Sequence, residues 1–75
     1  MPKAFVMVDV FPGKEASVQK ALSQLPGMKF VHQVTGAHDL IALLDIDPYE
    51  QLASVVSMIR KVDGIRSTDT ELVIG

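Results

Sequence analysis

Residues Val34-Thr35-Gly36-Ala37-His38-Asp39-Leu40 decide how this chain folds. Strand-like segments flank the stretch, one over residues 28–34 and the other over residues 40–46. Gly36 can adopt a positive φ without steric cost, and Asp39 can accept hydrogen bonds from nearby backbone N–H groups. The stretch therefore predicts a β-hairpin turn. The same turn is a candidate loop for a small ligand, through Gly36, Ala37, His38 and Asp39.

Outward from the turn, the chain divides into two similar strand–helix–strand halves. The expected elements, in order, are a strand over 4–11, a helix over 14–25, strands over 28–34 and 40–46, a second helix, and a strand over 65–74. Apolar residues at helical spacing mark both helices: Val18, Ala21, Leu22 and Leu25 in the first, and Leu52, Val55, Val56 and Ile59 in the second. For the second helix, Asp47 is the expected N-cap, Pro48 the first helical residue and Gly64 the C-cap.

The two halves correspond at an offset of 37 positions. At this offset Val18 corresponds to Val55, Leu22 to Ile59, Leu25 to Val62 and Gly27 to Gly64. Two strand–helix–strand units joined by a tight hairpin are typical of the ferredoxin-like βαββαβ fold. Right-handed crossovers then place both helices on one face of a four-stranded antiparallel sheet. The sequence therefore predicts an α+β, ferredoxin-like fold.

The two faces of the predicted sheet differ in composition. One contains only apolar side chains and is expected beneath the helices: Ala4, Val6, Val8, Val10, Leu40, Ala42, Leu44 and Ile46. The other carries a second apolar set, interrupted by Asp9 and Asp45: Phe5, Met7, Phe11, Ile41 and Leu43. Monomers rarely expose an apolar patch of this extent, and a chain of 75 residues has a small core of its own. We therefore expect this second face to be the dimer face of a homodimer.

Composition excludes several classes of protein. The chain has no cysteine, so disulfides and thiolate metal sites are excluded. Asp9 interrupts the N-terminal apolar run, so we expect no signal peptide, no membrane contact and a cytoplasmic location. The net charge is −2, and the seven Lys and Arg residues are spread along the chain. None of the four aromatic residues has a basic cluster beside it. This pattern argues against direct binding of nucleic acid.

Few residues offer catalytic chemistry. His32, His38 and Asp39 lack a third metal ligand at a useful spacing, so we expect neither a metal nor another cofactor. His38 and Asp39 are sequence neighbours, which point to opposite faces of a strand and so make a poor general-base pair. Nucleophile, phosphate-loop and dinucleotide motifs are absent. We therefore expect that the protein is not an enzyme. Thr68 and Thr70 lie one strand step apart on the same face of the last strand. They are either residues that simply favour a strand or two hydroxyls that bind a ligand.

Three segments together resemble the RAM domain, the ligand-sensing domain of Lrp/AsnC (feast/famine) transcription regulators. These are the Val34–Leu40 turn, the helix opened at Asp47, and Gly64-Ile65-Arg66-Ser67-Thr68-Asp69-Thr70, and the resemblance covers essentially the whole chain. It implies a βαββαβ domain that dimerises through its sheets and assembles into octameric or similar rings. It also implies that small effectors, typically amino acids, bind between dimers near the Gly-x-x-Asp turn. The resemblance thus favours Gly36, Ala37, His38, Asp39, Thr68 and Thr70 as ligand-binding residues.

The chain departs from the family pattern in two respects. His38 stands where the family usually has Tyr, and the first strand begins almost at Met1 without a preceding helix-turn-helix. We therefore expect a single stand-alone domain, residues 1–75, that binds an amino acid or related metabolite. It would act on transcription by mixed assembly with a full-length Lrp/AsnC regulator. In the expected site, the turn and Asp39 receive a ligand ammonium, and Thr68 and Thr70 of the same or a neighbouring subunit receive its carboxylate.

Other functions are compatible with the same sequence. One is a small cofactor-free enzyme of the monooxygenase or isomerase type, which would need a deep pocket and would depend on His32. Another is a purely structural assembly module that binds no metabolite. An ACT-type regulatory domain has the same fold and amino-acid effectors.

Overall fold

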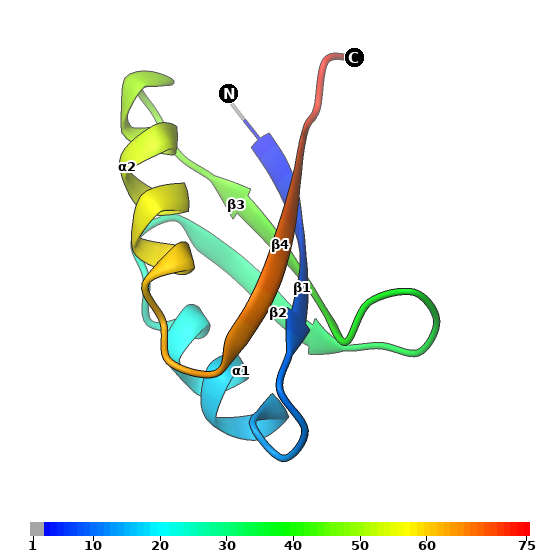
Figure 1. The fold of residues 1–75 in the computed structure, drawn as a ribbon. Coiled ribbons are helices and arrows are strands. Elements are labelled where there is room, and N and C mark those ends of the chain that lie inside the picture. Colours follow the sequence, from blue (N-terminus) through cyan, green and yellow to red (C-terminus); the bar gives the residue numbers. More distant parts are fainter. Residues whose placement is uncertain (1–2) are drawn as a thin grey trace.

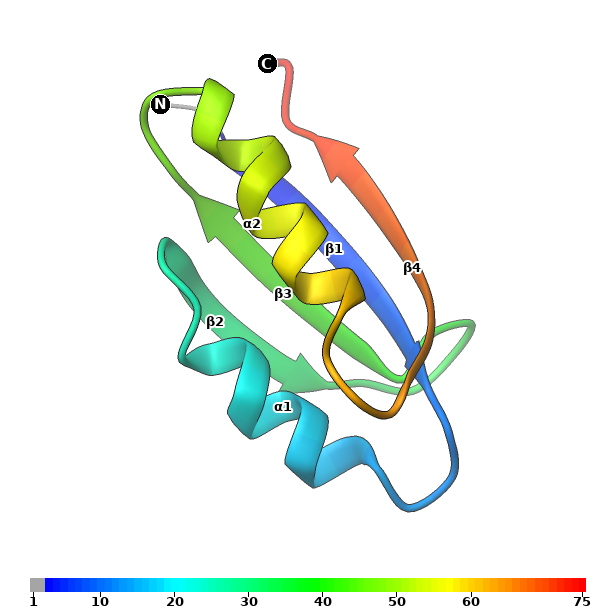
Figure 2. The same ribbon diagram turned by 60° about the vertical axis from the view of Figure 1, so that its left-hand side comes forward.

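The chain folds as a four-stranded antiparallel sheet with two helices on one face (Figures 1 and 2). The computed structural model describes residues 3–75. Its elements are β1 (Lys3–Val10), α1 (Glu15–Ser23), β2 (Met28–Gln33), β3 (Leu40–Asp45), α2 (Glu50–Arg60) and β4 (Ile65–Leu72). The strand order is β2-β3-β1-β4, so β1 and β3 are central. This arrangement is the predicted α+β ferredoxin-like fold.

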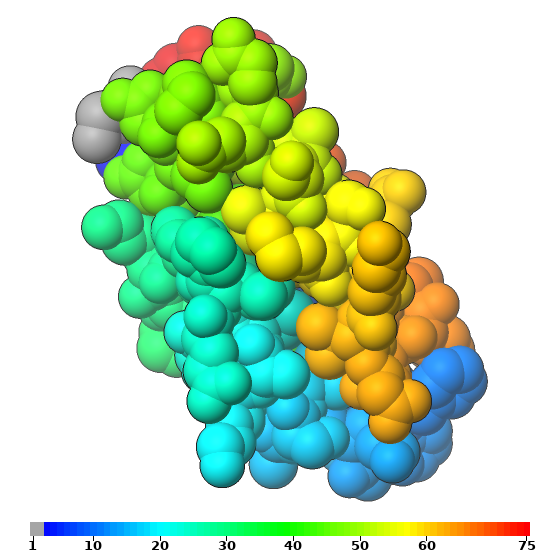
Figure 3. Space-filling view, turned by 90° about the vertical axis from the view of Figure 1, so that its left-hand side faces the viewer, coloured from blue at the N-terminus to red at the C-terminus, as the bar shows by residue number. Residues whose placement is uncertain are grey.

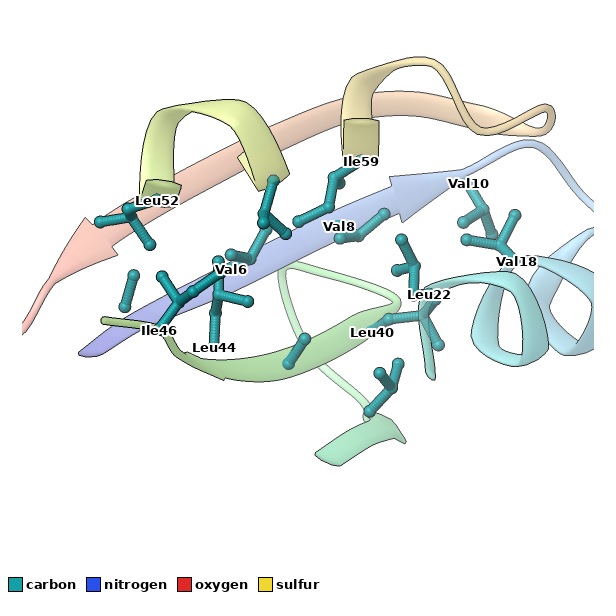
Figure 4. Packing of buried hydrophobic residues seen from close by; sticks show 14 residues of the cluster. Val6, Val8, Val10, Val18, Leu22, Leu40, Leu44, Ile46, Leu52 and Ile59 are labelled. Atoms are coloured by element: carbon teal, nitrogen blue, oxygen red, sulfur yellow. The ribbon is translucent and has the colours of Figure 1, made fainter. Parts of the chain in front are cut away.

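The core lies between the sheet and the helices, and the central strands supply half of its buried residues. Alternate residues of β1 and β3 are buried, as the pattern of the sequence predicted. Val18 and Leu22 of α1 and Leu52, Val55 and Ile59 of α2 pack onto them (Figure 4). Each fully buried Val, Leu or Ile side chain stabilises the fold by about 1.5–3 kcal/mol relative to an exposed one. Among residues 3–75, the buried set contains no charged or polar residue.

The internal repeat is visible in three dimensions. β1 and β3 begin at Lys3 and Leu40, and β2 and β4 begin at Met28 and Ile65, at the offset seen in the sequence. Equivalent helix positions, such as Leu22 and Ile59, are fully buried in both halves. Figure 3 looks onto the helix layer, where α1 (cyan) and α2 (yellow) lie side by side. The two halves thus build equivalent parts of one core.

The ends of α2 differ from those expected. The helix begins at Glu50, and Tyr49 occupies the N-cap position in a helical conformation without a side-chain capping bond. The C=O groups of Pro48 and Tyr49 accept the N–H groups of Gln51 and Leu52 at 3.0 and 2.9 Å, so the first turn closes through the backbone. The prediction that Asp47 caps the helix and Pro48 opens it is therefore wrong.

The prediction that Gly64 is the C-cap is also wrong, because α2 ends at Arg60 and Lys61 takes that position. Gly64 lies further along, where its C=O accepts the Phe11 N–H at 2.9 Å and ties two loops together. Helix α1 is shorter than the expected 14–25, and the strands end one or two residues early, which is the usual uncertainty of such boundaries. Neither helix of residues 3–75 is long and apolar enough to cross a membrane.

Candidate functional site

The loop between β2 and β3 is anchored to the end of β1 by Asp39. Val34 donates its N–H to the Asp39 C=O at 3.0 Å, and the Asp39 N–H bonds to the Val8 C=O at 3.1 Å. The Asp39 carboxylate accepts the Val10 N–H through Oδ2 at 2.9 Å. Asp39 therefore has a structural role that the sequence did not reveal, and its Oδ1 has no hydrogen bond to any residue of 3–75. The loop curves away to the side opposite the helices (Figure 1).

The tip of this loop is open. Gly36 has a φ of 109°, and no atom lies within 4 Å of the position a Cβ would take. Ala37 is exposed beside it, whereas His38 and Asp39 are half-buried. The tip thus has exposed backbone and space around it, which a second molecule can approach.

His38 takes part in a polar cluster with residues from β1 and β4. Its Nδ1 lies 3.2 Å from Asp9 Oδ1, and the Ser67 hydroxyl donates to Asp9 Oδ2 at 2.8 Å. The Ser67 hydrogen bond is the largest cause that holds the pKa of Asp9 below its ordinary value of 3.8; desolvation opposes it, and the hydrogen bond with His38 and the charges of His38 and Arg66 lower the pKa further. The sequence indicated Asp9 only as an interruption in an apolar strand. Its partners lie 29 and 58 positions away, so only the tertiary fold reveals them.

Thr68 and Thr70 lie on the helix side of β4. In the β1–β4 register they stand opposite Val8 and Val6, whose side chains form the core. The Thr70 Oγ1 is buried and has no hydrogen-bond partner. Because the His38 cluster lies on the other face of the sheet, one chain does not bring the two sets of predicted ligand-binding residues together.

A cleft of about 660 Å³ runs between α2 and β4. Its lining consists of Tyr49, Glu50, Leu52, Ala53, Val56, Ser57, Arg60, Thr70 and Leu72. A smaller cleft of about 350 Å³ adjoins it at Arg60, with Thr68 in its lining. The larger volume is in the usual range for small-molecule sites. Leucines and valines fill the centre of the layer, but the edge strand β4 lies beside α2 without a helix of its own over it (Figure 2).

The helix-free face of the sheet is apolar at its centre. Phe5, Met7, Ile41 and Leu43 are half-buried on it, and Phe11 lies just past β1 with half its surface exposed. The β2–β3 register adds two residues that the sequence prediction missed, because Phe30 and His32 stand opposite Leu43 and Ile41. Their rings stack at 4.8 Å. His32, on which the enzyme alternative depended, therefore lies on this face and away from the cleft.

The border of this helix-free face is acidic and polar. On β4, the residues opposite Phe5, Met7 and Asp9 are Glu71, Asp69 and Ser67, and they are exposed. An apolar centre with a polar border is typical of an interface between protein chains. Within residues 3–75, no group of three or more His, Asp or Glu side chains is placed to hold a metal ion.

The fold and these features define a class of protein: a small ferredoxin-like domain with an interface-like sheet face and a ligand-sized cleft. The comparison with protein families specifies it further. Residues 3–75 match the Lrp/AsnC ligand binding domain, and the chain belongs to this family. The domain is a module for small-molecule effectors and for oligomerisation. Members of the family typically oligomerise and are typically non-enzymatic.

Individual relatives agree with this assignment. The chain is 34% identical over 70 residues to an uncharacterised HTH-type transcriptional regulator of Pyrococcus abyssi, covering 92% of this chain and 44% of that protein. It thus spans less than half the length of this curated relative. A crystal structure from Thermus thermophilus superimposes with a TM-score of 0.94 at 32% identity, covering 100% of this chain and 95% of the other. A hypothetical protein of Pyrococcus horikoshii gives 0.91 at 32% identity, covering 99% and 90%.

Proposed function

We propose that the protein is an effector-sensing assembly domain that binds an amino acid or a related small metabolite between subunits. The observation that carries this proposal is the match of residues 3–75 to a ligand-binding domain family. The open turn and the cleft supply space for a small ligand. Neither place brings together the nucleophile, base and oxyanion donors that covalent catalysis needs.

The proposed ligand site combines two chains. The Gly36–His38 backbone and the Asp39 carboxylate of one chain receive the ligand ammonium, and Thr68 and Thr70 of a neighbouring chain receive its carboxylate. The support for a shared site is geometric, because in one chain these groups lie on opposite faces of the sheet. The Asp39 Oδ1 is available for the ammonium while Oδ2 holds the Val10 N–H.

The proposed assembly is a dimer formed through the helix-free sheet face, with dimers joined into an octameric or similar ring. Its support is the apolar centre of that face and its acidic border. Covering Phe5, Met7, Ile41 and Leu43 removes apolar surface from water at roughly 25 cal/mol per Å². A domain of this size has few other means of enlarging its core.

We also propose that the domain acts on its own, as a single unit over residues 1–75, and reaches DNA only through a partner. The proposal is supported by two solved structures of similar proteins, because this chain covers 95% and 90% of their chains. The longer relative is an HTH-type transcriptional regulator. Mixed assembly with such a regulator would transmit the effector signal to transcription.

The test is a thermal-shift screen of the purified protein against the twenty amino acids. A ligand that binds only the folded form stabilises it by about 2.7 kcal/mol at a hundredfold excess over Kd, which raises the midpoint of a small domain by several degrees. We expect a shift with one or a few amino acids. Absence of any shift would contradict amino-acid sensing.

The Asp39→Asn variant tests the ammonium contact. Asn retains an oxygen for the Val10 N–H, so the fold is preserved while the negative charge is lost. A charged hydrogen bond contributes about 1.5–3 kcal/mol, so the Kd of the amino acid identified by the screen should rise roughly tenfold or more. An unchanged Kd, measured by isothermal titration calorimetry, would rule out this role for Asp39.

A further inference from the structure

The cleft between α2 and β4 has two chemically different ends. The helix and the strand run antiparallel through a short connection, so the C-terminal end of α2 lies beside the start of β4. Arg60 and Ser57 lie toward that end, and Thr70 lines the cleft from the strand. Tyr49, Leu52 and Leu72 line the opposite end, where the side chains are apolar apart from the carboxylate of Glu50 and the hydroxyl of Tyr49. The lining therefore suits a molecule with a polar head and an apolar tail.

Arg60 is the cation at the polar end. It lines both the larger and the smaller cleft, and no carboxylate of residues 3–75 lies within ion-pair distance of it. Its position in the last turn of α2 is favourable for a positive charge, because the helix dipole is negative there. A planar guanidinium binds a carboxylate through two parallel hydrogen bonds. The polar end is therefore suited to a carboxylate.

Thr70, on β4, provides a second polar group in the lining of this cleft. Its Oγ1 is buried without a partner, although its residue lines the cleft. A buried hydroxyl without a hydrogen bond is unfavourable. Rotation about χ1 moves the hydroxyl to another staggered position, from which the oxygen can face a molecule in the cleft. A bound carboxylate would then satisfy it.

Among residues 3–75, no carboxylate of the cleft lining lies near Arg60 to bind an ammonium. Glu50 is the acidic side chain of the lining, and it lies ten residues before Arg60 on the same helix. That separation corresponds to about 15 Å along the helix axis, which is far more than the distance between the amino and carboxyl groups of an α-amino acid. An α-amino acid held at Arg60 by its carboxylate therefore has its ammonium far from the backbone of Glu50.

We propose that this cleft is the half-site for the carboxylate and the side chain of the effector, with Arg60 as its anion-binding residue. The inference rests on the proposed function and specifies it: the effector is a carboxylate with an apolar side chain. Arg60 and Thr70 hold the carboxylate, and the side chain lies along Val56, Leu52 and Leu72. The ammonium projects from the cleft toward Asp39 of a neighbouring chain.

The two half-sites can be separated with matched ligands. A 2-oxo acid has the carboxylate and side chain of its amino acid but lacks the ammonium. The probes are L-valine, L-isoleucine and L-leucine, the corresponding 2-oxo acids, and L-glutamate as an acidic contrast. Isothermal titration calorimetry on the intact protein gives Kd for each, and backbone amide shifts of Ser57, Arg60 and Thr70 report the location.

Three variants complete the design. Arg60→Gln should raise the Kd of an apolar amino acid and of its 2-oxo acid alike, by roughly tenfold to a hundredfold. Asp39→Asn should raise the Kd of the amino acid and leave that of the 2-oxo acid unchanged. Lys61→Gln removes the neighbouring charge outside the cleft and should change neither. L-glutamate should bind more weakly than the apolar amino acids, because its second carboxylate would enter the apolar end.

Each other result has a definite meaning. If Asp39→Asn weakens binding and Arg60→Gln does not, the proposed function stands and the assignment of the cleft is wrong. If none of the probes binds at millimolar concentration, or if binding shifts only the amides of residues 36–39, the assignment is also wrong. Failure of all twenty amino acids in the thermal screen, with 2-oxo acids binding at Arg60, would overturn amino-acid sensing and leave the carboxylate site.

Thr70→Val is a second variant whose outcome does not depend on Arg60. It keeps the shape of the side chain and removes the unpartnered oxygen, so the unliganded protein should melt at a higher temperature. Binding of the apolar carboxylates should nevertheless weaken. A purely structural role for the Thr70 hydroxyl predicts the opposite change in melting temperature, and unchanged binding would remove Thr70 from the site.

Discussion

Asp9 joins three segments of the chain that are distant in sequence. It receives the Ser67 hydroxyl from β4 and lies 3.2 Å from His38 Nδ1 of the turn. These contacts stabilise the ionised carboxylate, and the pKa of Asp9 in the folded protein is consequently lowered. Its contribution to stability is fully present above the ordinary value of 3.8 and is lost as the pH falls through the lower, folded value.

Ser67→Ala tests this connection at the scale of one residue. Removing the larger cause of the shift should move the pKa of Asp9 back toward 3.8, which an NMR titration of its carboxyl carbon measures. The variant should unfold at a lower urea concentration than the parent at neutral pH, and the difference should vanish in strong acid. Ser23→Ala is the control, because the Ser23 hydroxyl donates only to the Lys20 C=O of its own helix. A difference that persists in strong acid would contradict the role of Asp9.

At the scale of elements, strand and helix positions were predictable because each depends on local pattern. Buried and half-buried residues alternate along β1 and β3, as the two-residue period of a strand requires. Val18 and Val55 are buried as helical spacing requires. The ends of α2 were not predictable in the same way. Asp47 is of a residue type that commonly caps helices, but the backbone of Pro48 and Tyr49 closes the first turn instead.

The candidate site was predictable only in part, because it depends on the register between strands. Pattern alone placed Thr68 and Thr70 on one face of their strand but did not determine which face. The regular register between β1 and β4 sets Thr68 opposite Val8, and thereby on the helix side. The cleft and the position of Arg60 follow from how far α2 covers β4, which is a property of packing rather than of either segment alone.

Gly27 lies between α1 and β2, in close contact with the end of β3. We therefore expect Gly27→Ala to destabilise the fold more than Gly13→Ala. Its φ is 78°, and an added Cβ would lie 2.9 Å from the Asp45 C=O oxygen and 3.1 Å from Ile46 Cβ. Gly13 is a matched control, because its φ is 84° and nothing lies within 4 Å of an added Cβ. Both Ala variants have the same backbone strain, but Gly27→Ala adds overpacking that costs about 1–3 kcal/mol. Equal free energies of unfolding for the two variants would show that the contact relaxes freely.

At the scale of the whole molecule, the proposed assembly depends on the helix-free face. Its apolar residues come from three strands, and its border on β4 is acidic. The pattern extends across β2, where Phe30 stacks on His32. The face is therefore broader than the five residues predicted from the sequence.

Leu43→Asp tests the role of this face. A carboxylate at its centre would have to be desolvated on association, so the variant should have the mass of a monomer in light scattering, and a lower melting temperature. Gln51→Asp places the same charge on the exposed start of α2 and should leave the mass unchanged. A Leu43→Asp protein that assembles like the parent would show that association uses another surface.

The two ends of the sheet carry different parts of the chain. The Val73 N–H donates to the Lys3 C=O at 2.9 Å, so the chain enters and leaves the domain at the same place (Figure 1). The Gly36 turn and the loops around Pro12 and Gly64 lie at the other end. A DNA-reading module, a purification tag or a second copy fused to either terminus would thus begin from one corner and leave the turn free. For the same reason, a circularly permuted chain could join residues 3 and 73 through a short linker and open at the exposed Gly36 without breaking any strand.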